Sequence, residues 1–171
     1  LMTYRFQGYW KDVGTIDSLW DANMDMLAVD SGVQLFDPSW PIYARTPTKP
    51  PHFMGSKAVV SHSMVTGGCE VYGEVENSVL FHSVRVEEGA RVKYSILMPG
   101  SVVKAGAVVE YAIVAENAVI GEGARVGAPP EADKPEEWGI AVVAEGIKVG
   151  DGARVPAKSM VTRNVKSGGV R

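Results

Sequence analysis

A six-residue period runs through the second half of the chain and constrains its fold more than any other feature. Every sixth position of a central run is aliphatic: Val84, Ala90, Ile96, Val102, Val108, Val114, Ile120 and Val126. Four residues after each of the later positions the side chain is small: Gly100, Gly106, Ala112, Ala118 and Ala124. A unit with one inward aliphatic residue and one small residue is typical of a parallel β-helix, because short strands form its flat sides and small residues fit its corners.

The same period continues on both sides of the central run. It passes through Val59, Val65 and Val71 upstream, with a one-residue slip near Asn77 or Ser78, and resumes downstream at Val143, Val149, Val155 and Val161. Three units per turn make a triangular coil, so residues 57–171 are predicted to form a β-helix of about five coils stacked about 4.8 Å apart. The stretch 128–141 is rich in proline and acidic residues and breaks the pattern, which predicts a loop inserted between coils.

The first part of the chain has a helical pattern followed by a proline-rich segment. One helix face would collect Ile16, Leu19, Trp20, Met24 and Leu27, which predicts an amphipathic helix from Ile16 to Leu27. Thr15 is a suitable N-cap, and Asp17 in the first turn complements the positive helix end. The sequence PTKPP opens residues 47–56, which we interpret as a linker between residues 1–46 and the repeat domain 57–171.

Composition and charge argue against several classes of function. The net charge is −3 and no dense run of Lys or Arg occurs, so no nucleic-acid partner is expected. The apolar runs are too short to cross a bilayer and no signal segment opens the chain, so we expect a cytoplasmic protein with no membrane partner. Cys69 is the single cysteine, which leaves no internal disulfide and no zinc site built from cysteines.

Histidines are the first candidates for catalysis in a hexapeptide-repeat fold. His52, His62 and His82 share no clear repeat phase, and no pair has the i, i+4 spacing of a helical metal site. Because histidine titrates near neutral pH, His62 or His82 could be the general base of a stand-alone acyltransferase that uses acetyl-CoA. Histidines at the surface or at corners of the repeat are the simpler interpretation.

Three other features have simple structural interpretations. Cys69 occupies a small corner position, and the Gly-Glu-Gly sequence at 121–123 is a repeat corner, because no strand-to-helix transition surrounds it as in a phosphate loop. An anion site could be built from the basic side chains of the repeat, but a solvated outer face is favoured for all of them: Arg85, Arg91, Lys93 and Lys104.

The stretch GYWKDVGTID, Gly8 to Asp17, has the chemistry of an active-site edge. An aspartate beside aromatic residues, just ahead of a helix, could hold Mg²⁺ between phosphate groups, since a hard cation prefers carboxylate oxygens. The residues alone leave a second interpretation open, in which Asp12 only tethers the Gly-Thr turn.

Four stretches, in their order, resemble the C-terminal part of the bacterial glucose-1-phosphate adenylyltransferases: YWKDVGTIDSLWDANMDML (9–27), DPSWPIY (37–43), GGCEVYGEVENSVLFHSVRV (67–86) and SILMPG (95–100). The resemblance extends to at least Gly127, and the Trp-x-Asp-x-Gly-Thr motif is shared with the wider sugar nucleotidyltransferases. It implies that the β-helix is left-handed and that residues 1–46 are a short, helix-containing remnant of an α/β nucleotidyltransferase domain.

The resemblance also implies an activity. Members of this family make ADP-glucose and pyrophosphate from ATP and glucose 1-phosphate, which supplies glycogen synthesis. By the family pattern, Asp12 is the second of two aspartates that hold Mg²⁺, and Trp10 and Lys11 flank it at the catalytic edge. The family's β-helix packs on the catalytic domain, builds contacts in a homotetramer and helps to form a site for a small phosphorylated allosteric effector.

The departures from the family pattern limit what this chain should do alone. The family's Gly-rich nucleotide loop, first metal aspartate and sugar-phosphate site have no counterpart here, so we expect the 171 residues by themselves to be inactive and to bind no cofactor. Oligomerisation and allosteric regulation are then the expected roles, and the intact Trp10-Lys11-Asp12 motif argues against a non-catalytic regulatory homologue. Enteric-type members have arginines where Glu116 and Glu145 stand, which disfavours fructose 1,6-bisphosphate as the activator.

Overall fold

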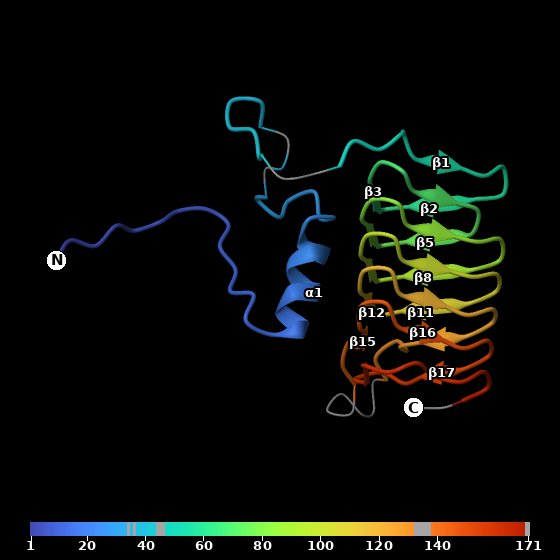
Figure 1. Ribbon diagram of the computed structural model, residues 1–171. Coiled ribbons are helices and arrows are strands. Elements are labelled where there is room, and N and C mark those ends of the chain that lie inside the picture. Colours follow the sequence, from blue (N-terminus) through green and yellow to red (C-terminus); the bar gives the residue numbers. More distant parts are fainter. Residues whose placement is uncertain (34, 36, 44–46, 132–137, 170–171) are drawn as a thin grey trace.

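The computed structural model of the protein describes residues 1–33, 35, 37–43, 47–131 and 138–169. Six coils of parallel strands are stacked into a β-helix, and helix α1 (Ile16–Asp25) stands beside the stack (Figure 1). Each coil gives one strand to each of three six-stranded sheets. The predicted fold class is confirmed, with six coils where the repeat predicted about five.

The three sheets run the length of the stack, with every pairing parallel. Sheet A contains β1 (Phe53–Met54), β4 (Glu70–Val71), β7 (Arg85–Val86), β10 (Val102–Val103), β13 (Val119–Ile120) and β16 (Lys148–Val149). Sheet B contains β2 (Val59–Ser61), β5 (Glu74–Glu76), β8 (Arg91–Lys93), β11 (Val108–Glu110), β14 (Arg125–Val126) and β17 (Arg154–Val155). Sheet C contains β3 (Met64–Val65), β6 (Val79–Leu80), β9 (Ile96–Leu97), β12 (Ala112–Val114), β15 (Ala141–Val143) and β18 (Met160–Val161).

The core is a column of aliphatic side chains enclosed by the three sheets. In the third and fourth coils it contains fully buried residues from each sheet in turn: Val86, Val92, Leu97, Val103, Val109 and Val114. Val86 pairs in register with Val103, 17 residues later, so a regular coil is one residue shorter than three hexads. The uniform six-residue step is therefore wrong for part of the central run. Val114, Ile120 and Val126 lie in the core, whereas Val102 and Val108 face outward and Ile96 is buried outside the column, against α1.

The short step lies at the corner between sheets B and C. Single residues in the left-handed conformation turn this corner, among them Tyr94 (φ 47°) and Tyr111 (φ 50°), so five residues separate core positions there. Ser78 and Ser95 follow the corner and are fully buried, and each hydroxyl accepts a hydrogen bond from a backbone N–H of the next coil. This ladder satisfies buried backbone donors that the strand pairing leaves free.

The upstream boundaries follow the prediction only in part. The one-residue slip predicted near Asn77 or Ser78 is present, because Asn77 (φ 45°) turns the corner between sheets B and C and five residues separate the core residues Val75 and Leu80. A second shortening, which the period did not predict, lies at residues 72–73, where a Cβ on Gly73 would come within 2.4 Å of the Ala90 carbonyl oxygen. The first paired strand, β1, begins at Phe53, within the stretch that we interpret as a linker.

Of the predicted loop 128–141, residues 132–137 lie outside the described residues, and β15 begins at Ala141. The division of the chain into three regions stays a prediction.

Helix α1 forms where the apolar spacing predicts it but ends at Asp25, two residues before the expected Leu27. Thr15 is its N-cap: the hydroxyl of Thr15 accepts a hydrogen bond from the Ser18 N–H, and the Ser18 hydroxyl accepts one from the Thr15 N–H. This reciprocal capping box satisfies two donors that a helix start otherwise leaves unpaired. None of the described helices is long and apolar enough to cross a membrane.

Candidate functional site

The residues predicted to lie at a catalytic edge stand next to α1, in the order Trp10, Lys11, Asp12. The ammonium group of Lys11 contacts two carboxylates of the helix, at 2.5 Å from Asp21 Oδ2 and 2.7 Å from Asp25 Oδ2. Hydrogen bonds to Asp21 and Asp25 raise the pKa of Lys11, so its ammonium group stays charged. Lys11 is therefore bound to the helix and is not directed into an open cavity of the described chain.

Trp10 and Asp12 have a different environment from Lys11. The Trp10 side chain is 76% exposed, and Asp12 is exposed with no hydrogen bond or ion pair to the described residues. No group of three or more His, Cys, Asp or Glu side chains among the described residues could hold a metal ion. Of the two aspartates that the resemblance assigns to the divalent-cation site, the described chain contains the one at Asp12.

An aromatic cluster joins α1 to the β-helix on the opposite side of the helix from Lys11. The indole N–H of Trp20 donates to the carbonyl oxygen of Tyr94 at 2.7 Å, and its ring lies 5.9 Å from that of Tyr111. Tyr94 and Tyr111 stack at 4.8 Å, and Trp138 meets Tyr111 edge-on at 5.5 Å. Ile96 and Ile113 of sheet C complete the buried contact with the helix. Helix, corner and inserted segment are thus held together at one place.

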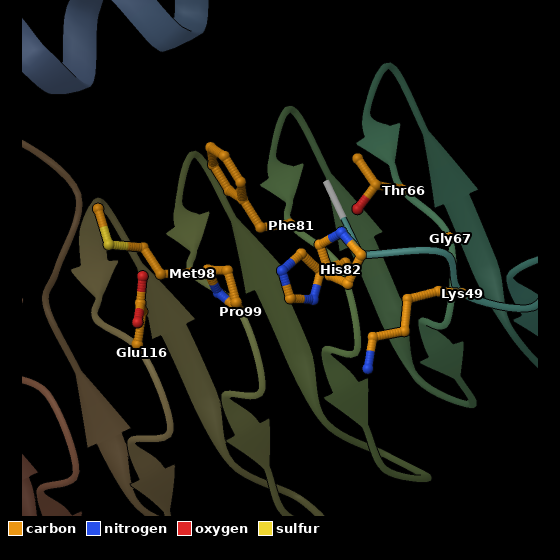
Figure 2. Close-up of a pocket in the computed structure, with 9 residues that line it drawn as sticks. Lys49, Thr66, Gly67, Phe81, His82, Met98, Pro99 and Glu116 are labelled. Carbon is orange, nitrogen blue, oxygen red and sulfur yellow. The ribbon is translucent and has the colours of Figure 1, made fainter. Parts of the chain in front are cut away.

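A pocket of about 650 Å³ opens beside the ends of strands β3, β6, β9 and β12 of sheet C. Phe81 and Met98 give this pocket an apolar lining. The two residues are neighbours because they directly follow strands β6 and β9, which pair in register. Figure 2 shows Lys49 and Glu116 at opposite ends of this pocket with His82 between them. The pocket can therefore receive a small molecule with an apolar part, and offers it a cation at one end and a carboxylate at the other.

The other histidines and the basic residues have ordinary surroundings. His62 Nδ1 lies 2.6 Å from Asn77 Oδ1 at the exposed corner of the repeat. Arg85 pairs with Glu70 at 2.8 Å on the outer face of sheet A, and Lys93 pairs with Glu76 at 2.8 Å on the outer face of sheet B. These ion pairs support a solvated outer face over an anion site. Burial raises the pKa of the Cys69 thiol, whose hydrogen bond goes to the Phe81 carbonyl oxygen.

Sequence reasoning missed the aromatic cluster and the pocket. Tyr94 and Tyr111 are 17 residues apart, the length of one coil, so a correct coil length would have placed them on top of each other. Nothing local in the sequence connects Trp20 to either tyrosine. Pocket residues from neighbouring coils likewise become neighbours only after the coils are stacked.

Comparisons with known proteins agree with the repeat. Residues 49–150 match the family described as GlmU-like, C-terminal hexapeptide. Glucose-1-phosphate adenylyltransferases of Bacillus mycoides, Bacillus cytotoxicus and Bacillus anthracis are 50%, 51% and 50% identical to this chain over 100 residues. That match covers 58% of this chain but 27% of each relative, so the chain spans only about a quarter of the length of these relatives.

The predicted resemblance to the C-terminal part of glucose-1-phosphate adenylyltransferases is confirmed by these relatives. The family match covers more than half of the chain and coincides with the coils from Lys49 to Gly150. On fold and sequence together, the chain belongs to the GlmU-like family of C-terminal hexapeptide domains.

Proposed function

We propose that this chain is the C-terminal portion of a glucose-1-phosphate adenylyltransferase, which forms ADP-glucose and pyrophosphate from ATP and glucose 1-phosphate for glycogen synthesis. The observation that carries the proposal is the 50% identity over 100 residues to relatives of that name. The geometry is compatible with it, because α1 contacts the motif Trp10-Lys11-Asp12 on one side and the β-helix on the other.

The role proposed for Asp12 follows from its chemistry and exposure. Its carboxylate is exposed and free of partners among the described residues, so it is available to a cation brought by a nucleotide. Mg²⁺ would neutralise phosphate charge during attack of the sugar phosphate on the α-phosphorus of ATP. Trp10 and Lys11 border this carboxylate, Trp10 as an exposed aromatic face and Lys11 as the connection to α1.

Regulation and assembly are the proposed roles of the β-helix. The pocket beside His82 is a candidate for a small phosphorylated effector, with Lys49 and His82 able to meet its negative charge. Glu116 at the other end of the pocket opposes a second phosphate, which disfavours fructose 1,6-bisphosphate as the activator. Homo-oligomer contacts would use outer coil faces and ends, where Phe53, Val59 and Met160 are exposed.

The proposal is tested by following ADP-glucose formation from ATP, glucose 1-phosphate and Mg²⁺. We expect none from the 171 residues alone, and activity from a longer protein that carries them after a nucleotide-binding domain. In that longer protein Asp12→Asn should lower kcat more than about 100-fold, as expected for a direct metal ligand. ADP-glucose made by the 171 residues alone, or full activity of Asp12→Asn, would contradict the proposal.

The rival acyltransferase function makes a different prediction. It requires acetyl-CoA to bind near His62 or His82, and calorimetry on the 171-residue chain measures this directly. Saturable binding that His82→Ala or His62→Ala abolishes would favour that function, whereas no heat of binding is expected under the adenylyltransferase proposal.

A further inference from the structure

Helix α1 has two functional faces, and each contacts a different part of the molecule. Trp20 and Met24 lie on the face that packs against sheet C. Asp21 and Asp25 lie on another face and contact Lys11. In Figure 1 the N-terminal segment descends along the side of α1 away from the β-helix before the helix begins. The helix therefore stands between the coils and the Trp10-Lys11-Asp12 segment.

Asp25 is the residue on which contacts from the N-terminal segment converge. Its Oδ2 accepts hydrogen bonds from the Lys11 ammonium at 2.7 Å and from the Tyr9 hydroxyl at 2.9 Å. Two side chains that flank Trp10 are thus held at one carboxylate oxygen. Charge-assisted bonds of this kind are stronger than neutral ones, and shared acceptors restrict both donors at once.

The position of Asp25 within α1 shows that the helix itself does not benefit from this carboxylate. Asp25 is the last residue of the helix, and the last turn contains no basic residue. A negative charge at a helix C-terminus is destabilised by the helix dipole. The carboxylate is stabilised instead by the segment it binds, since the hydrogen bond from Lys11 is the main cause that lowers the pKa of Asp25.

We propose that Asp25 is a positioning residue: through Lys11 and Tyr9 it fixes the segment that carries Asp12 onto a helix that is itself docked on the β-helix. The inference deepens the proposed function and rests on it for the role of Asp12 as a metal ligand. The contacts of Asp25 with Lys11 and Tyr9 do not depend on that role. A shift of α1 on sheet C would move Lys11, and with it the adjacent Asp12, because one rigid element connects them.

The test uses backbone order in the 171-residue chain, measured by ¹⁵N relaxation at Trp10 and Asp12. Parent protein should give an order parameter near 0.85 at both amides, and Asp25→Asn should lower both below about 0.6. Lys11→Met should do the same, whereas Lys11→Arg should keep the order because a guanidinium can still bind Asp21 and Asp25. Asp30→Asn is the matched control: Asp30 is exposed, with no hydrogen bond or ion pair to the described residues.

A second readout separates positioning from helix stability. Because Asp25 opposes the helix dipole, Asp25→Asn should leave the hydrogen-exchange protection of α1 amides unchanged or raise it, while the segment before the helix loses order. Low order at Trp10 and Asp12 in the parent protein, unchanged order in Asp25→Asn, or loss of helix protection along with the segment would each overturn the inference.

The consequence for catalysis is measured in a longer protein that contains this chain. Asp25→Asn should raise the Mg²⁺ concentration for half-maximal activity about tenfold, with Asp30→Asn unchanged, because positioning groups around a metal affect its affinity. An unchanged Mg²⁺ dependence overturns the positioning role. If the longer protein makes no ADP-glucose at all, the proposed function fails, and the order measurement still decides whether Asp25 holds the segment.

Discussion

The β-helix and the N-terminal region use their apolar side chains in opposite ways. Core residues of the coils such as Leu80, Leu97 and Ile120 are completely buried. In the region before residue 47, by contrast, Trp40 is 83% exposed and Tyr43 is 91% exposed. A coil buries its apolar residues against the next coil, so the repeat makes its own core. The N-terminal region contacts the coils chiefly through α1.

The largest expected difference between the two regions is the cost of removing an apolar side chain. Leu97→Ala should lower the free energy of unfolding by about 3–4 kcal/mol, because a fully buried leucine leaves a cavity between neighbouring coils. Tyr43→Ala should change it by less than about 0.5 kcal/mol, since that ring is exposed. Urea titration followed by circular dichroism measures both, and equal losses would show that the comparison is wrong.

Glycines give a second contrast. Gly127 has a φ of 75°, and a Cβ there would lie 1.9 Å from the Glu110 carbonyl oxygen, so Gly127→Ala should cost roughly 2–3 kcal/mol. Gly32 in the N-terminal region has a φ of 74°, but its added Cβ would meet only Tyr9 Cβ at 3.8 Å. Gly32→Ala should therefore cost only the strain of the left-handed conformation, about 1–2 kcal/mol. Thermal unfolding of both variants would sharpen the contrast, and a larger effect at Gly32 would contradict it.

The contact between the regions is tested at Trp20. Trp20→Phe removes the hydrogen bond to the Tyr94 carbonyl oxygen and should weaken docking of α1 by about 1–1.5 kcal/mol. Hydrogen exchange should become about tenfold faster at α1 amides and stay unchanged in β8 and β11. Trp40→Phe is the control, because that side chain is exposed. Faster exchange in the coils of Trp20→Phe would mean that the helix stabilises the β-helix itself.

The smallest expected effect is a pH dependence confined to the N-terminal region. The pKa of Asp25 is lowered in the folded protein, mainly by the hydrogen bond from Lys11, so its contribution is complete above the ordinary pKa of 3.8. It decreases as the pH falls through the lower pKa of the folded state. Order at Trp10 and Asp12 should thus persist from pH 7 to about pH 4 and decrease at lower pH. Loss of order already at pH 6 would exclude Asp25 as the cause.

Much of the fold was predictable because its signals are local. The period identified the parallel coils, and Thr15 and Ile16 marked the start of α1. The exact phase was not predictable in this way, because the corner at Tyr94 and Tyr111 uses one left-handed residue that a uniform period does not reveal. The inserted segment could be located by its prolines, but its contact with Tyr111 through Trp138 could not.

The candidate site was predictable only as a set of residues. The sequence singled out Trp10, Lys11 and Asp12 by motif, and their roles in catalysis stay predictions. It did not show that Lys11 binds Asp25, 14 residues later, because that pair forms only once α1 is folded and the preceding segment lies along it. The pocket beside His82 likewise needs neighbouring coils to be in register.

The sequence by itself determined a parallel β-helix preceded by a short helix, because both signals are local. Aliphatic and small residues recur every five or six positions in the β-helix, and apolar residues recur at helical spacing before it. Only the tertiary structure decided where the helix docks and what it holds. Trp20 reaches the carbonyl oxygen of Tyr94 across 74 residues, a contact that depends on the stacking of whole coils. Contacts that recur in every coil produce a period in the sequence. The contact between Trp20 and Tyr94 occurs once, so no sequence pattern indicates it.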